Sequence, residues 1–339
     1  MDGAGRQLCR LRALRPNFFR PPPARSGTIV YAEGAVKHLI VGYDSFDNGA
    51  GLPQRAIDLA KASDAVLHLV NVVPAVRRIR FYKSSRVSAD EVQKLLVESR
   101  KNALAEMATH LAREDIEVET HVRTGIADEQ LIAAADEIDA DLIIVMDEKQ
   151  SRGEHGFGPV TMKLLRNSAR PVMALRTREV ADNPRIMAAV EVPSNEESTS
   201  GNNVLDMAVS LARALPNSHL HILHVWAVWG EELLRSQRYS EGEVDEICAE
   251  AEANARAELE SLIGGHALAD DSYTVHVEKG LAKTLIPELA ESLDAGIVVM
   301  GTASRGGLTG LLVGNTAEKI INKLPCSVVT VHPEPATDD

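Results

Sequence analysis

The chain has 339 residues, a formal net charge of −13 and 45% hydrophobic residues, with aromatic residues at only 4%. This length is sufficient for two domains of ordinary size, each with an aliphatic core of its own. The acidic balance excludes a generally nucleic-acid-binding surface, because phosphate backbones require an excess of Lys and Arg.

The three cysteines, Cys9, Cys248 and Cys326, lie far apart in the sequence. An odd number without CxxC spacing predicts neither a disulfide framework nor a zinc site, and a reducing compartment is the usual context. The apolar runs are too short to span a bilayer. We therefore expect a cytoplasmic protein without a metal and without a nucleic-acid or membrane partner.

Residues 1–33 form a basic extension that we exclude from the fold. Residues 1–27 contain six arginines, one acidic residue and three consecutive prolines. This composition predicts a disordered segment. It is also typical of an organellar transit peptide, or of a start codon assigned too far upstream, and these interpretations stay open. We expect the fold to be independent of residues 1–27.

Five short apolar segments recur in the same order in the two halves of the chain, about 150 residues apart. Their richness in Val and Ile predicts strands. The pairs are 37–44 with 185–191, 68–73 with 221–226, 118–125 with 273–280, 140–146 with 295–300, and 171–175 with 326–331.

Helical patterns lie between these strands. Residues 90–113 and 241–263 each place an apolar stripe at the 3.6-residue period of an amphipathic helix. Shorter helices are predicted over 128–139 and 282–294. The stripe of the first long helix contains Val92, Leu95, Leu96, Leu104, Met107 and Leu111, and that of the second contains Val244, Ile247, Ala251, Ala255, Leu259 and Leu262.

Strands that alternate with helices indicate α/β domains with parallel sheets covered on both faces. We predict two tandem, doubly wound, Rossmann-like domains, 34–176 and 185–333, joined by a polar linker over 177–184 and followed by a tail over 334–339. Each should form a separate five-stranded parallel sheet. The final strands, 172–175 and 328–331, are expected to pair across a pseudo-twofold axis, as an intrachain pseudo-dimer that also allows a homodimer.

The most informative segment is a glycine-rich stretch, 299–321, at the end of the fourth strand of the second copy. Gly314 precedes a helical pattern that Asn315 or Thr316 can cap. Backbone N–H groups at the start of a helix attract anions, and glycines allow a phosphate to approach the backbone closely. The segment therefore predicts an anion-binding loop.

This loop resembles the signature of the universal stress protein family: Gly, two residues, Gly, nine residues, then Gly followed by Ser or Thr, after the fourth strand. In members that bind nucleotides, the loop holds the triphosphate. The resemblance covers roughly residues 36–333. It implies two adenine nucleotide alpha hydrolase-like domains, similar to those of the tandem, E-type members of the family.

In the second copy, Gly301 and Gly314 match the first and last glycines of the signature at the required spacing. Ser304 stands at the middle glycine and Asn315 at the Ser/Thr position, so we expect ATP to bind only weakly. The resemblance implies candidate binding residues in this loop: Gly301, Thr302, Ser304, Arg305, Gly314, Asn315 and Thr316.

The first copy departs further from the signature. Asp147 and Glu148 stand where the loop begins, and Gly158 with Pro159 stands where Gly-Ser would. Carboxylates repel phosphate, and a proline lacks the N–H donor. We therefore expect no nucleotide in this loop.

The end of the first strand shows the opposite asymmetry. Family members that bind ATP have an Asp there, which contacts the adenosine portion. The first copy keeps it as Asp44, whereas the second copy has Glu191. Asp44 also fits a turn-forming carboxylate. Each copy thus retains a different half of a nucleotide site.

No catalytic residues are predicted, because the chain lacks a nucleophile motif and the loops of nucleotide-transferring relatives. His221 and His224 should point to opposite faces of a strand, so we interpret them, with His219, as ordinary strand residues. Trp226 and Trp229 are expected to pack beside the following helix.

Three classes of function remain. The leading one is a non-enzymatic stress-response protein with a cavity for a small or apolar ligand, or with a regulatory protein partner. The second is an ATP-binding, slowly hydrolysing switch with the nucleotide in the second copy. The third is a purely structural dimerisation module.

Overall fold

A computed structural model describes residues 36–43, 52–76, 88–147, 156–176, 184–192, 200–236, 239–266, 268–302 and 314–332. The predicted N-terminal extension, the tail and all of the linker except Pro184 lie outside the described residues.

The first half of the chain contains strands that alternate with helices, as the sequence predicts. The strands are β1 (His38–Gly42), β2 (Val66–Val73), β3 (Val118–Thr124), β4 (Leu142–Asp147) and β5 (Val172–Arg176). The helices are α1 (Gln54–Ser63), α2 (Ala89–Leu111), the 3-10 turn η3 (Ala112–Glu114), α3 (Ala127–Ile138) and α4 (Pro159–Asn167).

The second half repeats this order, and among the described residues it has one further short helix, α6, before its long helix. The strands are β6 (Arg185–Ala189), β7 (His219–Trp226), β8 (Tyr273–Lys279), β9 (Ile297–Gly301) and β10 (Ser327–Val331). The helices are α5 (Ser200–Ala214), α6 (Glu231–Ser236), α7 (Glu241–Gly264), α8 (Ala282–Ser292) and α9 (Asn315–Ile321).

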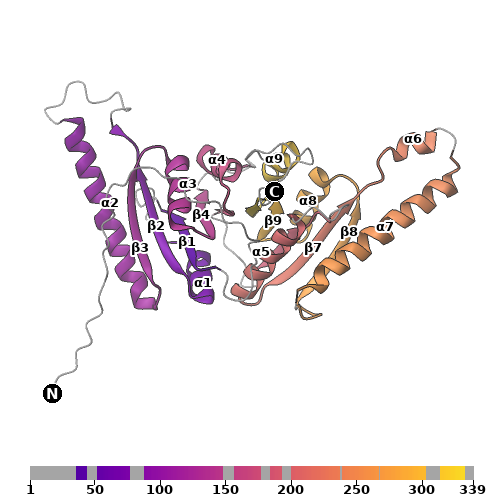
Figure 1. Ribbon diagram of the computed structural model, residues 1–339, viewed down its shortest axis with the longest axis horizontal. Helices are drawn as coiled ribbons and strands as arrows, with labels where there is room; N and C mark the ends of the chain where they lie inside the picture. Colours follow the sequence, from indigo (N-terminus) through magenta and orange to yellow (C-terminus); the bar gives the residue numbers. More distant parts are fainter. Residues whose placement is uncertain are drawn as a thin grey trace, which may run out of the picture.

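The strands form one ten-stranded sheet in the order β3-β2-β1-β4-β5-β10-β9-β6-β7-β8. Within each half the strands are parallel, and β5 pairs with β10 antiparallel, with Ala174 opposite Val328. The predicted pairing of the two final strands is confirmed. The prediction of two separate sheets is wrong, because this pairing joins them into a continuous sheet (Figure 1).

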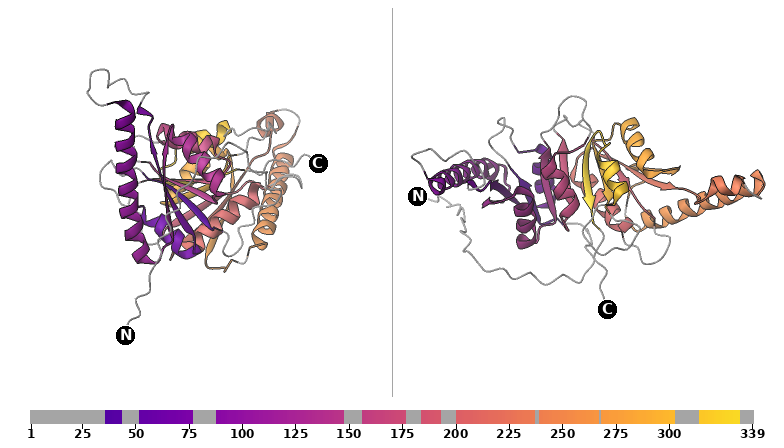
Figure 2. Two further views of the ribbon diagram at one scale, coloured as in Figure 1. Left: turned by 60° about the vertical axis from the view of Figure 1, so that its left-hand side comes forward. Right: turned by 90° about the horizontal axis from the view of Figure 1, so that it is seen from above.

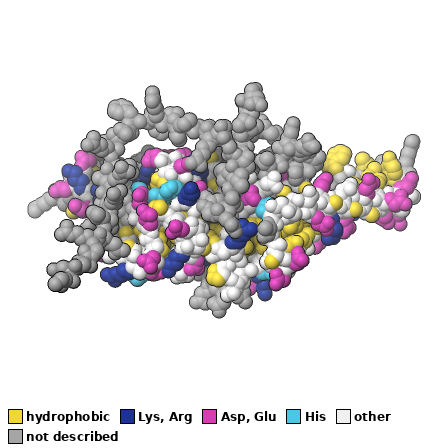
Figure 3. Space-filling model, turned by 60° about the horizontal axis from the view of Figure 1, so that its bottom comes forward, with side chains coloured by type: hydrophobic (Ala, Val, Ile, Leu, Met, Phe, Trp, Pro, Cys, Tyr) yellow, Lys and Arg dark blue, Asp and Glu magenta, His cyan; other side chains and the backbone are white. Residues whose placement is uncertain are grey.

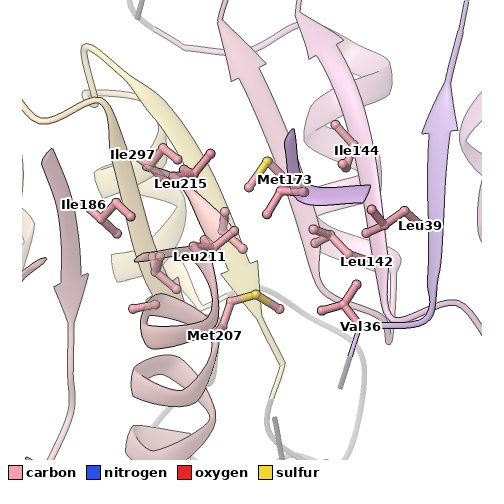
Figure 4. Packing of buried hydrophobic residues seen from close by; sticks show 14 of the residues in the cluster. Val36, Leu39, Leu142, Ile144, Met173, Ile186, Met207, Leu211, Leu215 and Ile297 are labelled. Atoms are coloured by element: carbon pink, nitrogen blue, oxygen red, sulfur yellow. The ribbon is translucent and has the colours of Figure 1, made fainter. Parts of the chain in front are cut away.

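Helices cover both faces of this sheet, and each hydrophobic layer runs across both halves (Figure 2). One layer holds α1, α2, α5 and α7, and the other holds α3, α4, α8 and α9. In the first layer, Met173 of β5 faces the same space as Met207 and Leu211 of α5 (Figure 4). The halves therefore share their cores, which stabilises their relative placement.

Two buried arginines of the first half also bind the second half. The guanidinium of Arg176 donates to the carbonyl oxygens of Cys326 and Leu324, at 3.1 and 3.0 Å. Arg55 of α1 donates to the carbonyl oxygen of Gly296 at 3.4 Å. Buried charged donors require such acceptors, so these contacts favour one register of the halves.

The two long helices extend beyond the sheet. In α2, Leu104 and Leu111 are buried, but Leu95 is 62% exposed, and Ile247 of α7 is 37% exposed. Part of each apolar stripe is therefore not covered by the described residues of the sheet or of the other helices. Figure 1 shows α6 and the start of α7 projecting from the body, and Figure 3 shows hydrophobic side chains at this end. No helix among the described residues is long and apolar enough to cross a membrane.

Candidate functional site

The described residues include Gly301, Thr302, Gly314, Asn315 and Thr316 of the predicted site. They lie together where β9 ends and α9 begins, at the carboxyl ends of the second-half strands, where ligands bind in doubly wound folds. The other predicted residues, Asp44, Ser304 and Arg305, lie outside the described residues.

Thr302 connects the parts of this loop that the structure describes. It is 1% exposed, and its N–H donates to the carbonyl oxygen of Val331 at 3.2 Å. Its hydroxyl oxygen lies 2.7 Å from Nδ1 of His332, and its carbonyl oxygen accepts the N–H of Gly314 at 3.1 Å. The end of β9, the end of β10 and the start of α9 are thereby held together.

The start of α9 differs from the prediction. Gly314 is the N-cap residue, and no side chain makes a capping hydrogen bond there. Asn315 and Thr316 are exposed residues of the first turn, so the prediction that one of them caps the helix is wrong. The N–H of Gly314 is already bound to Thr302, and it is therefore unavailable to a phosphate in this conformation.

The corresponding loop of the first half contains its own anion. Asp147, 4% exposed, ends β4, and its carboxylate oxygens accept the N–H of Gly158 at 3.0 and 3.2 Å. Gly158 is the N-cap residue of α4, so the carboxylate lies at the positive end of the helix dipole. The predicted carboxylate thus occupies the place at which a phosphate would bind a helix N-terminus.

A cation supports this carboxylate from the neighbouring strand. Asp147 lies opposite Arg176 in the β4–β5 ladder. Burial lowers the pKa of Arg176, and the charge of Asp147 opposes this shift. At the same ladder position the second half has Gly301 opposite Val331, so this pair of charges is absent from those two positions.

In both halves a side chain of the second strand forms a hydrogen bond with a backbone carbonyl oxygen just after the first strand. Asn71 of β2 donates to the carbonyl oxygen of Tyr43 at 2.7 Å. Nδ1 of His224 on β7 lies 3.0 Å from the carbonyl oxygen of Val190, which accepts from it. His221 contacts His276 instead, on the other face of the strand, as expected. His224 is therefore a structural donor beside the loop.

Two tryptophans lie at and just after the end of β7, and they differ in exposure. Trp226 is buried against Val244 and Cys248 of α7, as predicted. Trp229 is 96% exposed, so its predicted packing beside the helix is wrong. The reason is that α6 carries the chain away from the sheet before α7 begins.

Three histidines of the first half, His38, His68 and His121, were not among the predicted site residues. The structure places them in a row across β1, β2 and β3. The available signal was one histidine in each of the first three strands. That these histidines contact one another can be inferred only when the register of the strands is known.

Comparison with known proteins identifies relatives of both halves. The model of the Universal stress protein family matches residues 35–176 and again residues 183–332. The chain is 24% identical to the Universal stress protein E homolog of Haemophilus influenzae, over 79% of this chain and 88% of that protein. It is 28% identical to Universal stress protein E of Escherichia coli K12, over 57% of this chain and 61% of that protein.

Solved structures show the same fold. A putative universal stress protein from Pseudomonas aeruginosa aligns with a TM-score of 0.64 and 24% identity, covering 89% of this chain and 95% of that one. A universal stress protein from Archaeoglobus fulgidus aligns with a TM-score of 0.62 and 19% identity, covering 87% and 98%. The predicted tandem, Rossmann-like organisation and the resemblance to the E-type members are confirmed.

Proposed function

Because the chain belongs to the universal stress protein family, we propose that it is a non-enzymatic, cytoplasmic stress-response protein whose two halves differ in ligand binding. In this proposal the first half binds no nucleotide at its loop. The second half provides the cavity for a small or apolar ligand, and the complex acts on a regulatory protein partner.

The observation that carries the proposal is the hydrogen bond between Asp147 and Gly158 in the first half. A triphosphate placed here would have to displace a buried carboxylate from a helix N-terminus and would meet its negative charge. Arg176, which could have paired with a phosphate, is already bound to carbonyl oxygens of the second half. Both effects oppose nucleotide binding.

A second candidate function, an ATP-dependent switch, is favoured by one observation in the second half. Gly301 stands where the first half has Asp147, so no carboxylate arises from this position. A Cβ added at Gly301 would first meet Val204 at 3.7 Å, which leaves room at the strand end. A nucleotide in this protein is therefore assigned to the second half.

We expect such binding to be weak. Gly314 gives its N–H to Thr302, and Ser304 replaces the middle glycine of the signature. Each hydrogen bond lost to a charged phosphate costs about 1.5–3 kcal/mol, or roughly 10- to 100-fold in affinity. A dissociation constant well above the micromolar range and no measurable turnover follow.

Isothermal titration calorimetry of the full chain with Mg-ATP tests both candidates. The informative variant is Gly301→Asp, which reproduces in the second half the carboxylate that closes the first. We expect it to abolish any ATP binding seen with the wild type. The matched variant Asp147→Gly, which removes the carboxylate of the first half, should leave the affinity of the second half unchanged.

The outcomes separate the two functions. Weak binding lost in Gly301→Asp, without phosphate release, supports the ligand-binding protein with an altered nucleotide site. Micromolar binding with steady phosphate release supports the switch. Binding that is retained in Gly301→Asp and lost in a first-half variant contradicts the assignment of the two halves.

A further inference from the structure

Four side chains of the first half form a cluster near the edge at which the strands begin. His38 comes from β1, His68 from β2, and Glu119 and His121 from β3. Register places Glu119 beside His68, and alternate residues of a strand share a face, so His121 lies on that same face. The cluster lies at the opposite edge of the first-half strands from the loop at Asp147.

Three ligand atoms in this cluster converge on one point. Nδ1 of His68 lies 3.2 Å from Nε2 of His121 and 3.4 Å from a carboxylate oxygen of Glu119. The same oxygen lies 3.8 Å from Nε2 of His121. Nitrogen and oxygen ligands of tetrahedral zinc, bound at about 2.0–2.2 Å, lie roughly 3.3–3.6 Å from one another. The three separations are close to those of a tetrahedral site.

We propose that His68, His121 and Glu119 bind one divalent transition-metal ion, with Zn²⁺ as the best fit. Imidazole nitrogens bind transition-metal ions well, whereas Mg²⁺ and Ca²⁺ bind oxygen ligands. Two imidazoles and one carboxylate therefore favour a transition-metal ion over Mg²⁺ or Ca²⁺. Three protein ligands leave the fourth tetrahedral position to water. Glu119 is half-exposed, which gives an ion access from solvent.

His38 has the position of a residue that orients a metal ligand. Its Nδ1 lies 3.1 Å from Nε2 of His68, the ring nitrogen that faces away from the three-atom cluster. If Nε2 of His68 donates its proton to His38, Nδ1 is free to bind the ion. Metal-binding histidines commonly donate their second N–H in this way, which fixes the tautomer and the ring orientation.

The surroundings are compatible with a cation. His68 is 3% exposed, and a neutral imidazole is the form of histidine that binds a metal ion. Arg123 lies two residues beyond His121, and its guanidinium is paired with the carboxylate of Glu137. The positive charge of Arg123 is thus offset, and the carboxylate of Glu119 leaves the cluster with a net negative charge.

The second half contains an incomplete copy of this cluster. His221 and His276 take the places of His68 and His121, with ring nitrogens 3.1 Å apart. Thr274 stands at the position of Glu119, and its hydroxyl is bound to His219 at 2.8 Å. Arg185 stands at the position of His38. Burial lowers the pKa of His221, and the charge of Arg185 adds to this shift. The pair has no carboxylate at the position of Glu119, although the charge of Glu278 reaches His276, and it lies near a cation. It therefore serves as an internal control.

The test is titration of the untagged, chelator-treated full chain with Zn²⁺ by calorimetry, and with Co²⁺ by visible absorption. We expect one ion per chain, and a Co²⁺ spectrum of a four-coordinate site without a thiolate charge-transfer band. Glu119→Gln, at a half-exposed position that the fold tolerates, should weaken binding at least tenfold. His121→Gln should weaken it about 100-fold, and His38→Gln about 10-fold.

The matched control is His276→Gln in the second half, which should leave stoichiometry and affinity unchanged. Circular dichroism of each variant checks that a loss of binding is not caused by a loss of fold. If a histidine variant misfolds, Glu119→Gln still tests the proposal, because Glu119 is half-exposed and its substitution should not disturb the fold. Three results would overturn the proposal: no Zn²⁺ binding below millimolar concentration, full binding in Glu119→Gln, or loss of binding in His276→Gln.

Discussion

Asp147 and Gly301 occupy the same position in the two halves, each as the last residue of the fourth strand and opposite the last residue of the fifth. At this position the first half has a buried carboxylate bound to the N-cap residue of the following helix. The second half has a glycine there, Gly301, which carries no side chain. This one difference between the copies therefore decides whether a carboxylate from the end of the fourth strand binds the N-cap residue of the next helix.

Removal of the carboxylate should destabilise the first half. Asp147→Ala leaves the N–H of Gly158 without its acceptor, and it leaves Arg176 without the neighbouring charge. We expect a loss of about 1–3 kcal/mol in the free energy of unfolding, measured with urea. Gly301→Ala is the control, because its Cβ has an ordinary contact at 3.7 Å. Equal stabilities of Asp147→Ala and the wild type would contradict this account.

The buried side chain of Arg176 should stabilise the junction between the halves more than the partly exposed ion pair of Arg166 with Glu318 does. Arg176→Ala removes the guanidinium donor from the buried carbonyl oxygens of Cys326 and Leu324, and we expect a loss of about 2–4 kcal/mol in the free energy of unfolding. Arg166 also crosses between the halves, to Glu318, but both side chains are about one-third exposed. Arg166→Ala should cost less than about 1 kcal/mol.

Urea unfolding of both arginine variants gives this comparison, and the slope of the transition reports whether the halves still unfold together. A smaller effect for Arg176→Ala than for Arg166→Ala would show that the buried contacts do not stabilise the junction.

His332 should make the protein less stable in mild acid. Burial lowers its pKa from 6.5 to about 4. Between these values the unfolded chain binds the proton and the folded chain does not, so stability falls as pH decreases from about 6.5 to 4. The full contribution is at most about 3 kcal/mol, because one pKa unit corresponds to about 1.4 kcal/mol.

The variant His332→Gln isolates this contribution, because glutamine can still bind Thr302 but does not titrate. Unfolding free energies measured at pH 7, 5.5 and 4.5 should show a shallower pH dependence than the wild type. His110→Gln, at an exposed position, should retain the wild-type slope. A His332→Gln slope equal to that of the wild type would be evidence against a buried, neutral ring.

The two long helices offer a matched test of capping. Ser240 at the start of α7 forms a complete capping box with Glu243, whereas Ser88 at the start of α2 accepts only the N–H of Glu91. We expect Ser240→Ala to cost about 1–2 kcal/mol and Ser88→Ala about 0.5–1 kcal/mol. Thermal unfolding followed by circular dichroism gives the order, and a reversed order would show that the reciprocal bond adds nothing.

Most of the fold could be predicted because its signals are local. The repeated Val- and Ile-rich segments predicted each strand that the described residues form. The helices over 90–113 and 241–263 agree with α2 and α7 to within two residues. The helices α1, α4, α5 and α6 were not named. Helix α1 buries Arg55 beside small alanines, and a charged residue on the buried face weakens the periodic signal.

The sequence by itself determined the duplicated strand order and the presence of Asp147 in place of a glycine, because strand propensity and motif spacing act between neighbours in the chain. The tertiary structure alone decided that Asp147 binds Gly158 and that Gly314 is bound to Thr302. It alone brought His68 to His38 and His121, which are 30 and 53 residues away. Such contacts depend on strand register, in which a shift of one residue moves a side chain to the other face of the sheet.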